Sequence, residues 1–398
     1  MSDPATASTS TSEEVVLPIP DLALAQERFI LSQSKLSHLH DAAKKKLKEG
    51  IERDEMGAWL QSDPILQSAV DDKPEGVLYK TLKEKNVEEL KKLNEKITDA
   101  DANHGETELS DALRAKASYL AKIGKKEEAL EAYEYALSKQ AGLGAKIDLR
   151  LSMIRVGFFA ADFKVVSTNI EKTRDLIESG GDWDRRNRLK VYQGIYLLCI
   201  RDFKAGGTLL FDTISTFTAT ELISYEDFIA LCIIAGVLCL PRKELKQKII
   251  DSPEVIAVLP NLPHLQDFTS TLYNTEYAKF FRALAEVEEH HLIPNRVLEK
   301  HTRYYVKEMR IKAYAQLLES YRSVTLKSLA DAFGIGERFL EADLSKFISA
   351  GRLNCSIDRV NGIVETNRPD AKNARYEQAI KQGDVLLNSL QKLSRVIG

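Results

Sequence analysis

The chain has 398 residues, of which 44% are hydrophobic and 29% charged, a composition typical of globular proteins. Its 56 basic and 59 acidic residues give a formal net charge of -3. There is no overall excess of positive charge to attract nucleic-acid phosphates. The length allows two or three domains, or one elongated repeat array with an end module.

The chain begins with a segment unlike the rest. Residues 1–20 are rich in Ser and Thr and have neither a basic start nor an apolar run, so we expect a disordered tail and no secretory signal. Residues 21–109 have apolar residues at three- and four-residue steps, which predicts an N-terminal helical region. Asp63-Pro64 and Lys73-Pro74 predict breaks within it.

Helical repeats are expected over residues 110–300. The segment LRAKASYLAKIGKKEEALEAYEYAL, which begins at Leu113, has small residues, a turn glycine and one aromatic at the spacing of a tetratricopeptide repeat. These residues are Ala117, Gly124, Ala129, Tyr133 and Ala136. Small residues allow two antiparallel helices to approach closely, and the aromatic ring fills the gap beside them. The spacing therefore predicts a helical hairpin.

Two degenerate copies follow this hairpin. Gly157 and Gly194 each lie in an apolar helical stretch that ends in an Asp-Phe-Lys turn, so Phe163 and Phe203 repeat each other. We therefore expect a right-handed solenoid of helical hairpins, whose concave face is typically used to bind other proteins. Four prolines predict helix breaks near its end: Pro241, Pro253, Pro260 and Pro263.

The longest apolar run favours a buried helix over a membrane span. It covers Phe228 to Leu240, shorter than the roughly 20 residues that a spanning helix needs. The four cysteines form no C-x-x-C pair, which favours free thiols in a reducing compartment. They are Cys199, Cys232, Cys239 and Cys355. We expect a soluble intracellular protein without membrane contact.

Residues 301–368 change pattern. A long helix from His301 and a short extended SVTL stretch precede two helices, LKSLADAFGIG and ERFLEADLSKFISAG. A strand, RLNCSID, then meets the Asn361-Gly362 turn and the return strand IVETN. This order predicts a winged helix. We expect its wing edge, with Ile363 and Val364, to bind a neighbouring protein through unpaired backbone groups and an apolar contact.

A winged helix raises the possibility of DNA binding, but the charge of this one argues against it. Between Ser323 and Asp370 there are six basic and seven acidic residues, a net charge of -1. The helix that would enter the major groove has Glu337, Glu341 and Asp343 where phosphate contacts would be needed. We therefore expect no nucleic-acid partner.

The last helix is expected over residues 371–398, after Asn367-Arg368-Pro369. Its apolar and small residues alternate in four- and three-residue steps, which predicts a seam for a helical bundle. The seam comprises Tyr376, Ile380, Gly383, Leu387, Leu390, Ser394 and Ile397, and Leu386 and Leu393 widen it. Two interpretations remain open: docking with helices of other chains, or folding back on the solenoid.

No catalytic, cofactor or metal site is expected. His38-x-His40 resembles the H-x-H of metal-dependent isopeptidases, but Lys48 and Ile51 occupy the places of the required Ser and Asp. Glu289-His290-His291 lacks the H-E-x-x-H spacing of metalloproteases, and a solvated pair at a helix end is the simpler reading. No phosphate-binding or nucleophile motif occurs, so we predict that the chain is not an enzyme.

Helical repeats followed by a winged helix and a terminal helix resemble the PCI family, found in the proteasome lid, the signalosome and an initiation-factor complex. Long stretches are similar to one group, the seventh non-ATPase subunits of the proteasome lid. They are KKEEALEAY from Lys125, GDWDRRNRLKVYQGIYLLCIRDFKAGG from Gly181, and SLADAFGIGERFLEADLSKFISAGRLNCSIDRVNGIVETNRPD from Ser328. The resemblance extends from about Asp21 to the end.

The resemblance implies a mainly α, non-catalytic scaffold in ubiquitin-dependent protein degradation, in cytoplasm and nucleus. It implies a hetero-oligomer with other PCI-family lid subunits, the deubiquitinating metalloenzyme pair and the ATPase ring, whose deubiquitinating subunit the scaffold positions. The first signalosome subunit is the alternative, and a nucleic-acid-binding winged helix a more distant one. The predicted interface residues are Ile363, Val364, Tyr376, Ile380, Leu387, Leu390, Leu393 and Ile397.

Overall fold

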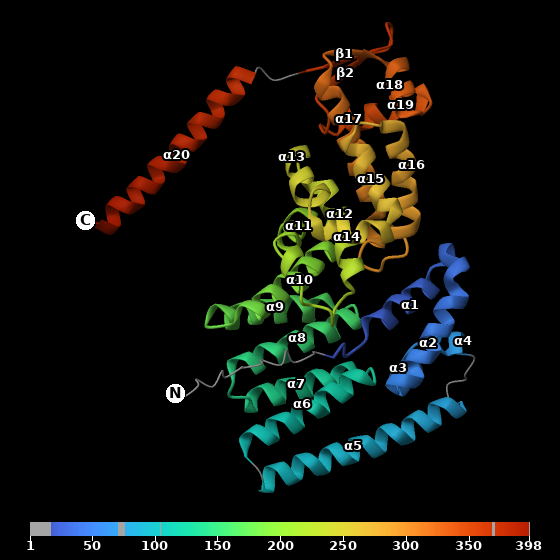
Figure 1. Cartoon of the computed structure of the whole chain (residues 1–398), viewed down its shortest axis with the longest axis vertical. Helices are drawn as coiled ribbons and strands as arrows, with labels where there is room; N and C mark the ends of the chain where they lie inside the picture. Colours follow the sequence, from blue (N-terminus) through green and yellow to red (C-terminus); the bar gives the residue numbers. More distant parts are fainter. Residues whose placement is uncertain (1–16, 71–75, 104, 368–370, 398) are drawn as a thin grey trace, which may run out of the picture. The chain divides into compact units, whose positions relative to one another are not determined.

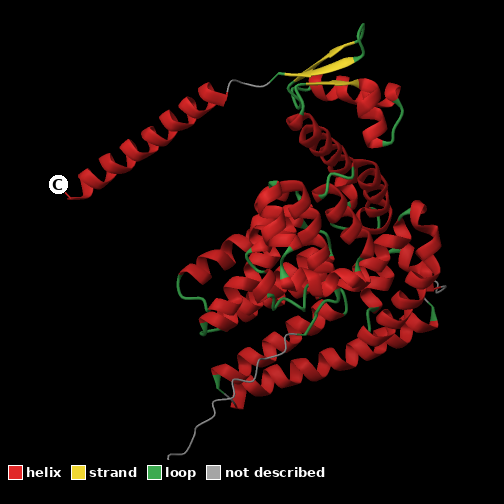
Figure 2. Cartoon of the chain, turned by 45° about the horizontal axis from the view of Figure 1, so that its top comes forward, coloured by secondary structure: helices red, strands yellow, loops and turns green. Residues whose placement is uncertain are grey.

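The computed structural model describes residues 17–70, 76–103, 105–367 and 371–397, and most of them are helical (Figure 1). The chain divides into two compact units, Met1–Thr269 with Glu286–Thr302 and Ser270–Ala285 with Arg303–Gly398. Among the described residues, strands occur only in the second unit, as one small sheet (Figure 2). No helix of the described ranges is long and apolar enough to cross a membrane.

The first unit begins with short helices and one long helix. Pro64 is the first residue of α4, as the predicted break requires, whereas Lys73-Pro74 lies outside the described residues. Leu47, Ile51 and Met56 are fully buried in the core of this region. The elements are α1 (Leu22–Ser32), η1 (Ser34–Leu39), α2 (His40–Asp54), α3 (Gly57–Ser62), α4 (Pro64–Val70) and α5 (Val77–Asn103).

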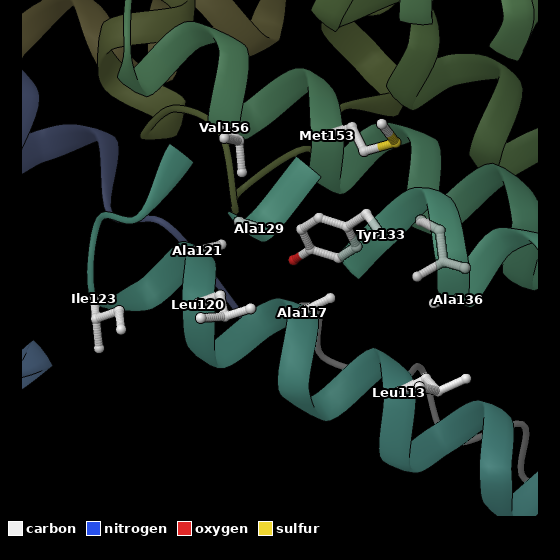
Figure 3. Packing of buried hydrophobic residues seen from close by; sticks show 11 residues of the cluster. Leu113, Ala117, Leu120, Ala121, Ile123, Ala129, Tyr133, Ala136, Met153 and Val156 are labelled. Carbon is white, nitrogen blue, oxygen red and sulfur yellow. The ribbon is translucent and has the colours of Figure 1, made fainter. Parts of the chain in front are cut away.

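Three helical hairpins follow and confirm the predicted repeats. They are α6 (Glu106–Lys122) with α7 (Lys126–Lys139), α8 (Leu143–Phe159) with α9 (Phe163–Glu178), and α10 (Trp183–Cys199) with α11 (Phe203–Phe211). In the first hairpin the Tyr133 ring lies among Ala117, Ala129 and Ala136 (Figure 3), and all four are buried. The small residues let α6 and α7 approach, and the ring fills the space between them.

The hairpins share a turn that explains the Asp-Phe-Lys repeat. Ala161 and Arg201 have positive φ values of 55° and 71°, like Gly124 at 83° in the first hairpin. The next residue caps the following helix: Asp162 accepts from the Lys164 and Val165 amides, and Asp202 from Ala205. An aspartate at this position satisfies amides that have no partner within the helix.

The apolar run predicted to be a buried helix is α12 (Tyr225–Cys239), and residues 228–237 are all buried. The prolines begin or interrupt the short helices that follow: Pro253 and Pro263 are first residues of α14 and α15. The remaining elements are η2 (Ile214–Thr216), α13 (Arg242–Leu245), η3 (Lys246–Ile250), α14 (Pro253–Val258), η4 (Leu259–Asn261), α15 (Pro263–Tyr273), α16 (Tyr277–Val287), η5 (Glu288–Leu292) and η6 (Glu299–His301).

The second unit contains the predicted winged helix, followed by the terminal helix α20 (Ala371–Ile397). The winged helix comprises α17 (Thr302–Ser320), β1 (Ser323–Thr325), α18 (Leu326–Phe333), α19 (Glu337–Ser349), β2 (Cys355–Asp358) and β3 (Ile363–Thr366). Residues 270–285 belong to the same unit, although the predicted repeats extend to residue 300. The rings of Tyr277 and Phe281 contact Phe333, which also meets Tyr314. This aromatic cluster joins α16, α17 and α18.

Candidate protein-assembly site

The predicted seam lies on α20, a helix of 27 residues. Its apolar side chains are exposed: Tyr376 by 68%, Ile380 by 64%, Leu387 by 57%, Leu390 by 53% and Leu393 by 55%. The side chain of Ile397, also predicted to be an interface residue, lies outside the described part. A continuous exposed apolar stripe is a common feature of surfaces that bind another protein or a membrane.

The stripe on α20 is wide. At 100° per residue, the positions of Ile380, Leu387, Leu390 and Leu393 span about 140° of the helix circumference. A seam between two helices alone is narrower, whereas a helix in a larger bundle buries a stripe of at least about 100°. The width of this stripe therefore fits contact with more than one neighbouring helix.

The sheet corrects the expectation of a free wing edge at Val364. The strand order is β1-β3-β2, so β3 is central. Val364 is opposite Val324 on one side and Ile357 on the other, and its side chain is fully buried. The prediction from the sequence was wrong because it placed the return strand at the edge of the sheet. It did not foresee that β1, about 40 residues earlier in the chain, pairs with β3. Ile363 lies in the same central strand.

The wing tip presents one apolar side chain. Val360 is 93% exposed in the turn between β2 and β3. The Asp358 carboxylate accepts from the backbone amides of Val360 and Asn361, at 2.9 and 3.3 Å, and Gly362 has a φ of 63°. The Asn361 side-chain amide also donates to the Asp358 carboxylate, at 2.7 Å, and this bond together with the two backbone bonds holds the pKa of Asp358 below its ordinary value. The turn is thus fixed by the predicted Asn-Gly pair together with Asp358.

Two of the three carboxylates of α19 are used within the chain. Asp343 is buried and lies 2.7 Å from Nη1 of Arg310 on α17, and Glu341 pairs with Arg359 at the wing. Both carboxylates thus form ion pairs within the chain, which the sequence analysis did not predict. Glu337 is exposed.

Of the histidine pair expected to be solvated, His290 and His291, only His290 is exposed. His40 Nε2 lies 3.1 Å from the Gln33 carbonyl oxygen, and His38 is exposed. His290 is exposed as predicted, whereas burial lowers the pKa of His291 to about 4. Both rings meet His264, which no motif indicated because it lies 26 residues earlier. Within the described ranges, no group of three or more His, Cys, Asp or Glu residues could hold a metal ion.

All four cysteines are free thiols, as predicted. Cys232 and Cys355 are buried, and Cys199 and Cys239 are partly buried. Burial raises the pKa of Cys199 to about 12 and that of Cys232 well above its ordinary value. A thiol must lose its proton to act as a nucleophile, so neither is suited to catalysis near neutral pH.

Helical repeats that lead into a winged helix and a terminal helix define a PCI-domain protein, and the PCI domain model matches residues 265–368. Two further family models match other parts of the chain. The 26S proteasome subunit RPN7 model covers residues 75–248, and the 26S proteasome regulatory subunit RPN7/PSMD6 C-terminal helix covers residues 375–397. The second of these coincides with the exposed stripe of α20.

Curated relatives agree over nearly the whole chain. The 26S proteasome non-ATPase regulatory subunit 6 of Oryza sativa is 43% identical over 95% of this chain and 96% of its own length. The protein of the same name in Dictyostelium discoideum is 43% identical over 97% and 99%. The 26S proteasome regulatory subunit RPN7 of Saccharomyces cerevisiae is 42% identical over 95% and 94%. The chain belongs to this RPN7/PSMD6 family.

Proposed function

We propose that this chain is a non-catalytic scaffold subunit of the lid of the proteasome regulatory particle, in cytoplasm and nucleus. The family supports a place in the 26S proteasome, since its members are named regulatory subunits of that particle. The observation that carries the scaffold role is the exposed apolar stripe on α20, in the segment that the family's C-terminal helix model matches. The relatives' proteasome names favour this reading over a signalosome subunit.

The energetics of the stripe favour assembly with other helices. Each leucine or isoleucine that passes from water into a bundle core contributes about 1.5–3 kcal/mol. Three leucines of the stripe (Leu387, Leu390 and Leu393) are each more than half exposed in this chain. Burying them against other subunits supplies enough free energy to offset part of the entropy lost on association.

The proposed partners have three kinds of role. Other PCI-family lid subunits supply the helices that cover α20 and the surfaces beside the winged helix, which gives a hetero-oligomer. The deubiquitinating metalloenzyme pair is held by this scaffold, and the ATPase ring lies below it. In this arrangement the chain positions the deubiquitinating subunit above the ring during ubiquitin-dependent degradation, and it binds no nucleic acid.

The test is purification of the chain from cells. A tagged full-length chain is isolated from cells without crosslinking, the particles are separated on a native gel, and the co-purifying proteins are identified by mass spectrometry. We expect most of the chain in particles containing the ATPase ring and the deubiquitinating subunit. Recovery as a free monomer, or with signalosome subunits in place of proteasome subunits, contradicts the proposal. A release of the chain by DNase treatment points to nucleic-acid binding.

A further inference from the structure

A segment of the first unit, residues 288–301, contacts three separate parts of that unit, and we name it the clasp. The Arg296 guanidinium donates to the Phe158 and Phe159 carbonyl oxygens at the end of α8, at 2.8 and 3.4 Å. The His301 ring lies 2.8 Å from the Cys199 carbonyl oxygen at the end of α10. The cationic guanidinium of Arg296 at the C-terminal end of a helix interacts favourably with the helix dipole. The clasp thus contacts the ends of two repeat helices.

The clasp also holds the N-terminal helices. The Gln26 side chain of α1 accepts from the Arg296 amide at 3.1 Å and donates to the Pro294 carbonyl oxygen. Ile293 lies against the buried cluster of Ile30 and Leu36. The clasp is therefore the common partner of α1 and of α8, elements that are more than 100 residues apart in the sequence.

Three histidines meet at the start of the clasp. The His264 ring of α15 is stacked on His290, with ring centroids 4.4 Å apart and planes at 15°, and it meets His291 edge-on at 6.2 Å. Parallel stacking of two imidazoles is compatible with neutral rings, but two imidazolium ions at this distance repel each other. The π-helix η5 supplies His290 and His291, so the stack joins η5 to α15.

Two carboxylates act on this triad. His264 Nδ1 lies 3.3 Å from Glu286 Oε2 on α16, and that carboxylate is about half exposed. Burial and the two neighbouring imidazoles lower the pKa of His291. Asp227, in the first turn of α12, raises it, but by less than these effects combined. The charge of a fully protonated triad would exceed what these two carboxylates neutralise.

We propose that His264, His290 and His291 form a proton-sensitive latch: when they are neutral the clasp holds α1 and α8 together, and protonation of the triad releases η5 from α15 and loosens the clasp. The latch is a property of the first unit and does not depend on the proposed function. Opening of the latch weakens the contacts by which the clasp holds the N-terminal helices.

The direction of the effect follows from linkage. The pKa of His291 in the closed clasp, about 4, is below the ordinary value of 6.5. A group with a depressed cationic pKa takes up its proton more readily when it is released, so opening is favoured as pH falls from 6.5 towards 4. For one group with these two values, the opening equilibrium rises about tenfold between pH 7.5 and 5.5. Below about pH 3 little further change is expected.

Trp59 is a natural reporter of the clasp. Its ring lies 4.8 Å from the Phe159 ring, at the same end of α8 that Arg296 holds, and it is buried. The other tryptophan, Trp183, is 63% exposed and can be replaced. In a full-length Trp183→Phe chain, we expect the Trp59 emission to shift to the red between pH 6.5 and 4 while the circular dichroism keeps its helical signal.

Matched variants test whether protonation of the histidine triad causes the Trp59 emission shift. Adding His291→Gln should abolish most of the emission shift. His264→Gln should move its midpoint to lower pH, because the loss of one neighbouring positive charge brings the pKa of His291 in the closed clasp nearer its ordinary value. His38→Gln changes an exposed histidine outside the clasp and should leave the curve as it is. An unchanged transition in the His291→Gln chain overturns the proposal, and so does a parent chain whose Trp59 emission is constant to pH 4.5.

A variant that fails to fold still leaves a decisive measurement. The Cε1 proton of His291 can be followed by NMR in the unaltered chain labelled with 13C-histidine. Titration of this ring below pH 5.5, followed by loss of its native chemical shift, supports the latch. Titration of this ring above pH 6 overturns it.

Discussion

Single small residues determine how closely the repeat helices approach. A Cβ atom placed on Gly194 would lie 2.6 Å from Leu210 Cδ2, and one on Gly157 would lie 2.8 Å from Val166 Cγ2. Ala117 occupies the corresponding crossing of the first hairpin and is fully buried. The repeat is thus specified by the absence of bulk at one position in each hairpin more than by any polar motif.

Replacing Gly194 by Val should therefore weaken the first unit. Leu210 is fully buried and has little room to move, so overpacking should lower the free energy of unfolding by about 1–3 kcal/mol. The control is Gly383→Val on α20, which makes the same change in helix propensity where no atom lies within 4 Å. Urea unfolding followed by circular dichroism checks both. Equal effects from the two variants would show that the crossing is not tightly packed.

The thiols of Cys199, which is partly buried, and Cys232, which is buried, give a second expectation for individual residues. Because burial raises the pKa of Cys199 to about 12, nearly all of this thiol is protonated at pH 7.5. We expect iodoacetamide to alkylate Cys199 and Cys232 far more slowly in the native chain than in urea. Mass spectrometry of the digested chain measures both rates. Rapid native labelling of either residue would contradict the burial.

At the scale of elements, two ion pairs of opposite polarity tie α17 to the rest of the winged helix. Arg310 of α17 pairs with Asp343 of α19 at 2.7 Å. Glu308, also on α17, accepts from Arg352, which follows α19, at 2.9 Å. Asp343 and Glu308 are both buried. Since α17 offers one cation to α19 and one anion to the segment after it, the pairs fix the register of these elements.

Because Asp343 is buried, removing its charge should lower the stability of the second unit strongly. Asp343→Asn leaves Arg310 without its counter-ion and should destabilise the second unit by about 3–5 kcal/mol. Glu341→Gln breaks the pair with Arg359, whose side chain is 75% exposed, and should change stability by less than about 1 kcal/mol. Thermal unfolding of the two full-length variants distinguishes these values. A similar small effect from both would mean that the Arg310 pair is well solvated.

Local sequence patterns were sufficient to predict most helices, strands and turns. Contacts between residues far apart in the sequence could not be predicted in this way. The Asn361-Gly362 turn, the Asp-Phe-Lys turns and the stripe of α20 are patterns within a few turns of chain. The central place of β3 depends on Val324 meeting Val364, and the histidine cluster on His264 meeting His290. No periodicity encodes contacts between residues so far apart. For the same reason the sequence suggested Val364 as a binding residue, although its side chain is enclosed in the sheet.

For the whole molecule, we expect the purified chain to show no hydrolase activity towards ubiquitin conjugates, with or without added zinc. Lys48 and Ile51 stand where an isopeptidase of the H-x-H type has its Ser and Asp. The His40 ring is also engaged with the Gln33 carbonyl group. Incubation with ubiquitin chains and electrophoresis of the products is the measurement. Cleavage that is lost on His38→Ala or His40→Ala would contradict the account.

In the proposed assembly, α20 joins this chain to the helices of other subunits. Leu387→Asp with Leu390→Asp places two charges in the apolar stripe, and Asn388→Asp with Lys392→Asp places two on the other side of the same helix. Both pairs are exposed in the isolated chain. The measurement is the fraction of each tagged variant that enters the regulatory particle in cells, alongside the Tm of the purified chain.

We expect the leucine variant to stay outside the particle with an unchanged Tm, and the control variant to enter it normally. The reason is that α20 contributes to assembly and little to the stability of either compact unit. Normal entry of the leucine variant would contradict the claim. A Tm lowered by several degrees with assembly retained would show that α20 is covered by its own chain.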